Sequence, residues 1–252
     1  MGLFGKSRFL EPEIEDWVLD CWGWLMRNLG GMSRLRATPL VTASREFFPP
    51  TDAQGHARAE YLFERVKTLM GLCDWPCQLD PVERPLEVRV GFYAKVNHGK
   101  GALGTFRYDD GQAVITYAAD LAGDPRQLIA TLAHELAHYR LAAIRAGTPG
   151  GESLHELATE LAVAHAGFGV FRANAAFRFE QHQDPFGQGW STSRAGYFTE
   201  PTWAFVIALF TALKGVNLPR GHLKDSVADL TNRAQRYLSR NDGLLEPLRK
   251  IA

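Results

Sequence analysis

The segment His134-Glu135-Leu136-Ala137-His138 limits the folds open to this chain more than any other part of the sequence. It fits the pattern HExxH, in which two histidines lie four residues apart. Residues at i and i+4 share one face of an α-helix, so both imidazoles can reach one metal ion only if the segment is helical. We therefore predict a helix here, with His134 and His138 as metal ligands and zinc as the expected metal. The alternative is a helix whose two histidines are core or surface residues without a metal.

The residues around this motif predict the bounds of its helix. Asp124 fits an N-cap, and Pro125 fits the first helical position. Gly147, followed by a proline two residues later, is a stop signal. We expect a helix from Pro125 to about Ala146, with the motif in its rigid middle. Its apolar stripe consists of Leu128, Leu132, Leu136 and Ile144.

A catalytic zinc site usually needs a third protein ligand, and the segment after the turn at 147–151 offers one. A second helix that begins near Glu152 would place Glu156 and Glu160 on one face. His155 is the other candidate ligand; because adjacent helical residues point about 100° apart, only one of the two can face the metal. The three glutamates could also form a solvated helix face.

The two motifs together, HELAH and then Glu156-x3-Glu160, resemble the gluzincin metallopeptidases, the thermolysin-like class, in which a helix bearing ExxxD follows the HExxH helix. The resemblance covers about residues 45–215, and its specificity lies in these two motifs. It implies that Glu156 is the third zinc ligand and that Glu160 accepts a hydrogen bond from His134. Glu160 stands where the class has aspartate, and its side chain is one methylene longer. A ligating histidine normally gives its other N–H to a carboxylate or a carbonyl.

The implied activity is zinc-dependent hydrolysis of a peptide bond in a peptide or protein substrate. Glu135 would be the general base, because it points away from the two histidines and cannot share their ion. Gluzincins usually draw an oxyanion donor from downstream of the third ligand, which makes Tyr197 the first candidate, with His182 and Arg194 as alternatives. Two other functions stay open: a zinc-binding module that binds peptides without cleaving them, and a metal-dependent hydrolase of a non-peptide amide.

A β segment precedes the metal-binding helix. Residues 86–92 alternate in hydrophobicity as a half-buried strand does. Residues 104–108 and 113–117 flank an Asp-Gly turn and predict a hairpin. In the zincin peptidases, which this order of segments resembles, an edge strand beside the active helix pairs with an extended substrate. Residues 101–106 are the candidate for that strand, although the hairpin could instead only cover the core.

Composition and segment order set the wider expectations. Lys+Arg and Asp+Glu both number 28, so no basic field favours a nucleic acid partner. Residues 203–213 are apolar but too few to span a bilayer, and the N-terminus lacks the apolar core of a signal peptide, so we expect a cytoplasmic protein without a membrane span. Three cysteines without a second ligand pair do not suggest a structural zinc site.

The fold class predicted from the segment order is α+β and zincin-like, with a small mixed sheet beside the HExxH helix. Further helices are expected at residues 13–29, 57–70, 201–213 and 224–240. We divide the chain into a helical region at 1–85 packed on the core, a catalytic domain at 86–215 and a helical extension at 216–252.

Overall fold

The computed structural model describes residues 8–83, 103–109, 111–180, 198–217 and 220–252. In these residues the fold is α+β, as predicted, with many helices and one small mixed sheet. The chain divides into two compact units, Ala43–Ala143 and Met1–Thr42 with Ile144–Ala252. These units are defined by compactness and not by function. They therefore do not test the predicted division into regions 1–85, 86–215 and 216–252, which stays a prediction.

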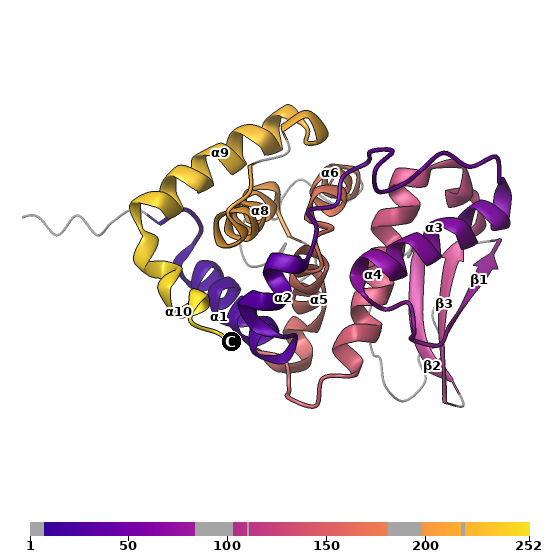
Figure 1. Ribbon diagram of the computed structural model, residues 1–252, viewed down its shortest axis with the longest axis horizontal. Helices are drawn as coiled ribbons and strands as arrows, with labels where there is room; N and C mark the ends of the chain where they lie inside the picture. Colours follow the sequence, from indigo (N-terminus) through magenta and orange to yellow (C-terminus); the bar gives the residue numbers. More distant parts are fainter. Residues whose placement is uncertain (1–7, 84–102, 110, 181–197, 218–219) are drawn as a thin grey trace, which may run out of the picture. The chain divides into compact units, whose positions relative to one another are not determined.

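The unit Ala43–Ala143 contains the sheet and two long helices (Figure 1). The strand order is β1-β3-β2, with β1 parallel and β2 antiparallel to β3. The predicted hairpin and the predicted helix at 57–70 are both confirmed. The elements are α3 (Gly55–Met70), β1 (Cys77–Val82), β2 (Gly104–Asp109), β3 (Gln112–Ala118), a 3-10 turn (Ala119–Gly123) and α4 (Pro125–Ala142).

Helices α3 and α4 cover the same face of this sheet. Gly104 of β2 pairs with Tyr117 of β3, so both residues point to one face. The Tyr117 hydroxyl lies 3.0 Å from Nδ1 of His56, near the start of α3. On the same face, a Cβ atom added at Gly104 would meet Thr131 of α4. The face that receives both helices is the one that holds the core residues Leu79 and Ile115.

Strand β1 was missed by the sequence analysis, which treated residues 1–85 as helical. Its sequence, Cys77-Gln-Leu-Asp-Pro-Val82, does not alternate clearly between apolar and polar residues. Only Leu79 is buried, and Pro81 is a residue that sheets accept on edge strands. The position of β1 at the edge of the described sheet agrees with that rule. The strand predicted at 86–92 lies outside the described residues.

The other unit is helical in its described residues, and α8 (Glu200–Lys214) lies at its centre. Residues 202–211 of α8 are all buried, which is the pattern of a helix surrounded by other elements. It packs against α5, α6 and α9. The helices predicted at 13–29, 201–213 and 224–240 are confirmed. The remaining helices of this unit are α1 (Pro12–Asn28), α2 (Gly31–Ala37), α5 (His155–His165), α6 (Gly169–Glu180), α9 (Asp225–Arg240) and α10 (Glu246–Arg249).

A buried carboxylate joins three segments of this helical unit. Glu15 of α1 is 1 % exposed. Its Oε2 accepts hydrogen bonds from the backbone N–H groups of Phe9 (3.0 Å) and Leu10 (3.2 Å). Its Oε1 accepts one from the Tyr237 hydroxyl of α9 at 2.7 Å. Glu15 therefore fixes both the segment before α1 and the position of α9.

None of the helices in the described part of the chain combines the length and the apolar character needed to cross a bilayer.

Candidate metal centre

Helix α4 carries the HExxH motif and begins where the sequence predicts. The Asp124 side chain accepts a hydrogen bond from the backbone N–H of Gln127 at 3.2 Å, which satisfies one of the unpaired donors of the first turn. The helix ends at Ala142, four residues before the predicted end at Ala146. Leu141 is its last buried residue, and the residues that follow are largely exposed. Without burial, helix propensity alone does not stabilise another turn here.

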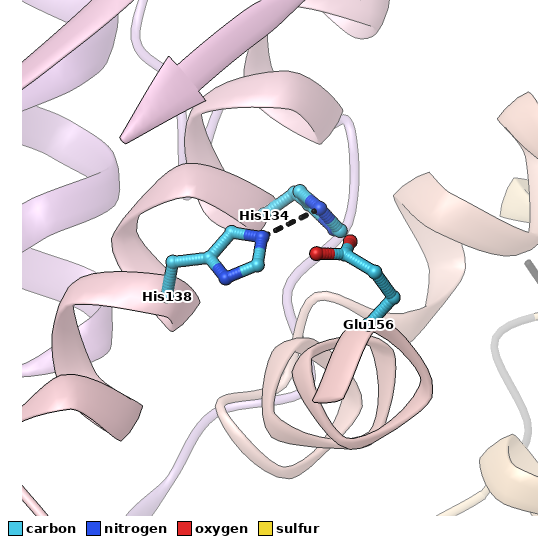
Figure 2. A group of neighbouring side chains, drawn as sticks. All are labelled: His134, His138 and Glu156. Atoms are coloured by element: carbon cyan, nitrogen blue, oxygen red, sulfur yellow. Dashed lines mark hydrogen bonds between the residues drawn. The ribbon is translucent and has the colours of Figure 1, made fainter. Parts of the chain in front are cut away.

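The two motif histidines point at each other from successive turns of α4. His134 is 6 % and His138 is 8 % exposed. Their Nε2 atoms lie 3.2 Å apart, and their ring planes are nearly perpendicular, at 84° (Figure 2). Two nitrogens bound to one zinc at about 2.05 Å in a tetrahedron lie about 3.3 Å apart. The separation in α4 therefore fits two ligands of one tetrahedral ion.

Glu156 is the third member of this group. It lies in the first turn of α5, and one carboxylate oxygen and the histidine ring nitrogens all lie within 4.8 Å of one another. Figure 2 shows the carboxylate and both imidazoles turned toward the same point. Of the two neighbours considered as third ligand, the group in the described residues includes Glu156 and not His155.

This donor set can hold a divalent metal ion. Two imidazoles and one carboxylate are the protein ligands of one type of catalytic zinc site, in which the fourth position of the tetrahedron is left for water or substrate. Imidazole also suits other transition metals, so the donors alone do not select the ion. The geometry is thus suited to a metal ion, and it does not select which one.

Glu135 lies beside the edge strand of the described sheet. Its side chain is 4 % exposed. An added Cβ atom at Gly104 of β2 would lie 3.2 Å from Cγ of Glu135 and 2.7 Å from Cγ2 of Thr131. Real Cβ atoms essentially never approach another atom as closely as 2.7 Å, and 3.2 Å is a tight contact, so β2 can lie this close to α4 because residue 104 is glycine. The predicted placement of residues 101–106 next to the motif is therefore observed for its described part, 103–106.

Glu160, one turn after Glu156 on α5, is fully buried and paired with Arg172 of α6. Nε of Arg172 donates to Oε2 of Glu160 at 2.8 Å, and Nη2 donates to Oε1. The sequence analysis missed Arg172. The available signal was a lone cation inside the apolar run Gly169-Val-Phe-Arg-Ala173, since a cation in a buried helix needs an anionic partner. The hydrogen bond predicted between Glu160 and His134 stays a prediction.

The three candidates for the oxyanion donor, Tyr197, His182 and Arg194, lie outside the described residues. Comparisons of the chain with protein-family models, with curated proteins and with solved structures gave no match.

Proposed function

We propose that this protein is a zinc-dependent metallopeptidase of the gluzincin type, with a zincin-like arrangement of sheet and active helix. The observation that carries the proposal is the convergence of His134, His138 and Glu156 on one point, with Glu135 buried beside the edge strand β2. The order of these groups along the chain is the one that the resemblance to gluzincins implies. Zinc held by these three side chains would supply Lewis acidity, which polarises a carbonyl and acidifies water.

Glu135 has the position of a general base in this proposal. It follows His134 directly on α4, so its side chain leaves the helix about 100° from that ligand and does not compete for the ion. The carboxylate takes a proton from the attacking water as the new carbon–oxygen bond forms. It then gives that proton to the leaving nitrogen as the carbon–nitrogen bond breaks. Positioned acid–base catalysis of this kind contributes about 10²–10⁴-fold in rate.

The sheet supports a peptide over a small molecule as substrate. In the described residues, β2 pairs with β3 on one side only, so its outer edge can accept another extended chain. Gly104 places β2 itself close to Glu135, on the face of the strand that packs on α4. A peptide that extends the sheet by β-augmentation would therefore pass the proposed base along its length.

The test is the substitution Glu135→Gln, which keeps the shape of the side chain and removes the base. We expect the variant to bind zinc as the wild type does and to lose hydrolysis by about 10²–10⁴-fold. Elemental analysis of the purified protein measures the first property, and a broad peptide-cleavage profile measures the second. Glu64→Gln is the matched control, because Glu64 lies on α3 with a side chain that is 60 % exposed. This control should change neither property.

Three results would contradict the proposal. If the wild-type protein takes up no zinc on titration, the proposed metal site does not exist. Zinc-loaded wild type that cleaves no peptide favours the non-catalytic binding module or the hydrolase of a non-peptide amide. If the Glu135→Gln variant cleaves peptides at the wild-type rate, Glu135 is not the general base.

A further inference from the structure

Four aromatic side chains form a continuous cluster in the unit Ala43–Ala143, and we name it the aromatic strip: Trp75, Phe106, Tyr108 and Tyr139. Tyr139 is its centre. The Tyr139 ring meets Trp75 edge-on with centroids 4.9 Å apart, stacks on Phe106 at 5.3 Å and lies 6.4 Å from Tyr108. Its hydroxyl donates to the carbonyl oxygen of Pro76 at 3.0 Å, which fixes the ring.

The strip is open to solvent at Tyr108. This side chain is 63 % exposed and, with Val216, is one of the two exposed large apolar side chains of the described residues. Phe106, Tyr139 and Trp75 are partly exposed. Aromatic rings that stack with each other and still face water are typical of binding surfaces, because a ligand can bury them without moving them.

The strip begins beside the proposed base. Gly104, Phe106 and Tyr108 alternate along β2 and so share the face that packs on α4. A strand rises about 3.3 Å per residue, which places Phe106 roughly 7 Å and Tyr108 roughly 13 Å along the strand from Gly104. Gly104 lies against Glu135, and Tyr139 follows the ligand His138 directly in the chain. The strip therefore shares α4 with the two motif histidines, and it shares β2 with the contact to Glu135.

A peptide paired with the outer edge of β2 would reach the strip with alternate side chains. Directly opposite residues on paired strands have Cβ atoms about 4.5–5.5 Å apart on the same face. The substrate residue opposite Gly104 would lie by Glu135, and the residue two positions away would lie over Phe106 and Tyr139. The next residue on that face would meet Tyr108.

We propose that the aromatic strip is a specificity subsite, which receives a large apolar side chain of an extended peptide two residues from the substrate residue opposite Gly104. This inference rests on the proposed function for its link to cleavage, but it makes a separate statement about binding. Full burial of an apolar side chain corresponds to roughly 10–100-fold in affinity. The strip covers such a side chain from one side only, so we expect about 3–10-fold.

The experiment compares blocked alanine-rich octapeptides that carry one phenylalanine, moved through each position, with the same peptide lacking it. The assays use three zinc-loaded proteins: wild type, Tyr108→Ser and Val216→Ser. Cleavage of each peptide gives kcat/KM. Calorimetry gives Kd for the same three proteins with Glu135→Gln added, so that the peptide is bound and not cleaved. Val216→Ser is the matched control, because it also removes an exposed apolar side chain. We expect one phenylalanine position to improve kcat/KM and Kd by about 3–10-fold in wild type and in the control, through KM and not kcat. In Tyr108→Ser that preference should fall to about twofold or less.

The outcomes separate the two proposals. Wild type that binds the phenylalanine peptide better through Tyr108 but cleaves nothing supports the subsite and contradicts the peptidase. Cleavage and binding that are indifferent to phenylalanine, or a preference that Tyr108→Ser keeps, overturn the subsite and leave the peptidase standing. A change in the sedimentation of Tyr108→Ser, with peptide preference intact, shows instead that the strip binds a second copy of this chain, and it also overturns the proposal.

Discussion

Replacing Gly104 by alanine tests the contact between β2 and α4 without any assumption about function. The added Cβ atom would lie 2.7 Å from Cγ2 of Thr131, 3.0 Å from the carbonyl oxygen of Thr116 and 3.2 Å from Cγ of Glu135. The Thr116 oxygen belongs to the ladder of β3 and cannot yield without disturbing the pairing of the two strands. Either β2 moves away from α4, or Thr131 and Glu135 shift on a helix whose motif face is buried.

The expected magnitude combines two opposite effects. An extra methyl group in a packed core usually costs about 1–3 kcal/mol of stability. Glycine inside a strand is otherwise less favourable than alanine by about 0.5–1 kcal/mol, because it loses more backbone entropy on folding. The net expectation for Gly104→Ala is a loss of about 1 kcal/mol in the free energy of unfolding. For a chain of this length that lowers Tm by about 2–4 °C.

The assay is thermal unfolding of four proteins, followed by circular dichroism: wild type, Gly104→Ala, Thr131→Ser and the double variant. Thr131→Ser deletes the Cγ2 methyl that makes the shortest of the three contacts. The double variant should therefore be more stable than the sum of the single effects predicts, by about 0.5–1 kcal/mol. Gly123→Ala is the control, because a Cβ atom there meets nothing within 4 Å. It should leave Tm unchanged within about 1 °C or raise it slightly.

One result refutes this reasoning clearly. If Gly104→Ala is more stable than wild type, the smaller loss of backbone entropy on folding is the only effect of the substitution, and β2 does not pack closely on α4. An additive double variant would likewise show that Thr131 is not the residue in contact.

Two further predictions concern single side chains. Glu156→Ala should weaken zinc binding by more than about 100-fold, because even the loss of a residue that only supports a ligand costs about 10–100-fold in metal affinity. His155→Ala should change the affinity by no more than about threefold. Competition with a chelator measures both affinities, and the reverse order would show that His155 is the ligand. Burial, together with the hydrogen bond to Glu15, raises the pKa of Tyr237 from the ordinary tyrosine value of about 10 to about 12. A pKa that is raised in the folded state contributes its full stabilisation below pH 10, and this stabilisation is lost as the pH rises toward 12. The Tm of the wild type should therefore fall over this interval, whereas the Tm of Tyr237→Phe should be lower at pH 8 and fall less. Parallel curves of Tm against pH for the two proteins would contradict the raised pKa of Tyr237.

Local signals predicted the elements whose bounds depend on local chemistry. The start of α4 follows from the side chain of Asp124, which caps the helix, and from the fixed φ of Pro125. The hairpin follows from an Asp-Gly turn, where Gly111 has a φ of +82°. The end of α4 was predicted too late, because it depends on where burial ends and not on the later glycine and proline. Strand β1 was missed because its pairing with β3 is parallel and distant in sequence, so nothing local marks it.

The candidate site also combines features that local sequence predicts with features that depend on contacts between distant residues. The spacing of His134 and His138 is a local property of one helix, and it was sufficient to predict their shared direction. The glycine at 104 was visible in the sequence, but its reason, the close approach of Glu135, depends on a contact between distant residues. Conservation of that glycine could have indicated a close approach, but a single sequence does not show it.

The pair formed by Glu160 and Arg172 shows what the fold adds to a motif. The sequence placed an acid at 160, and the fold buries this side chain completely, so that its charge requires a partner. Arg172 meets that requirement with two hydrogen bonds, one to each carboxylate oxygen. A carboxylate has about four lone-pair sites, so binding to Arg172 leaves it able to accept further hydrogen bonds. The pairing is therefore compatible with the bond predicted from His134, and it gives Glu160 a fixed orientation that the ExxxE spacing alone could not supply.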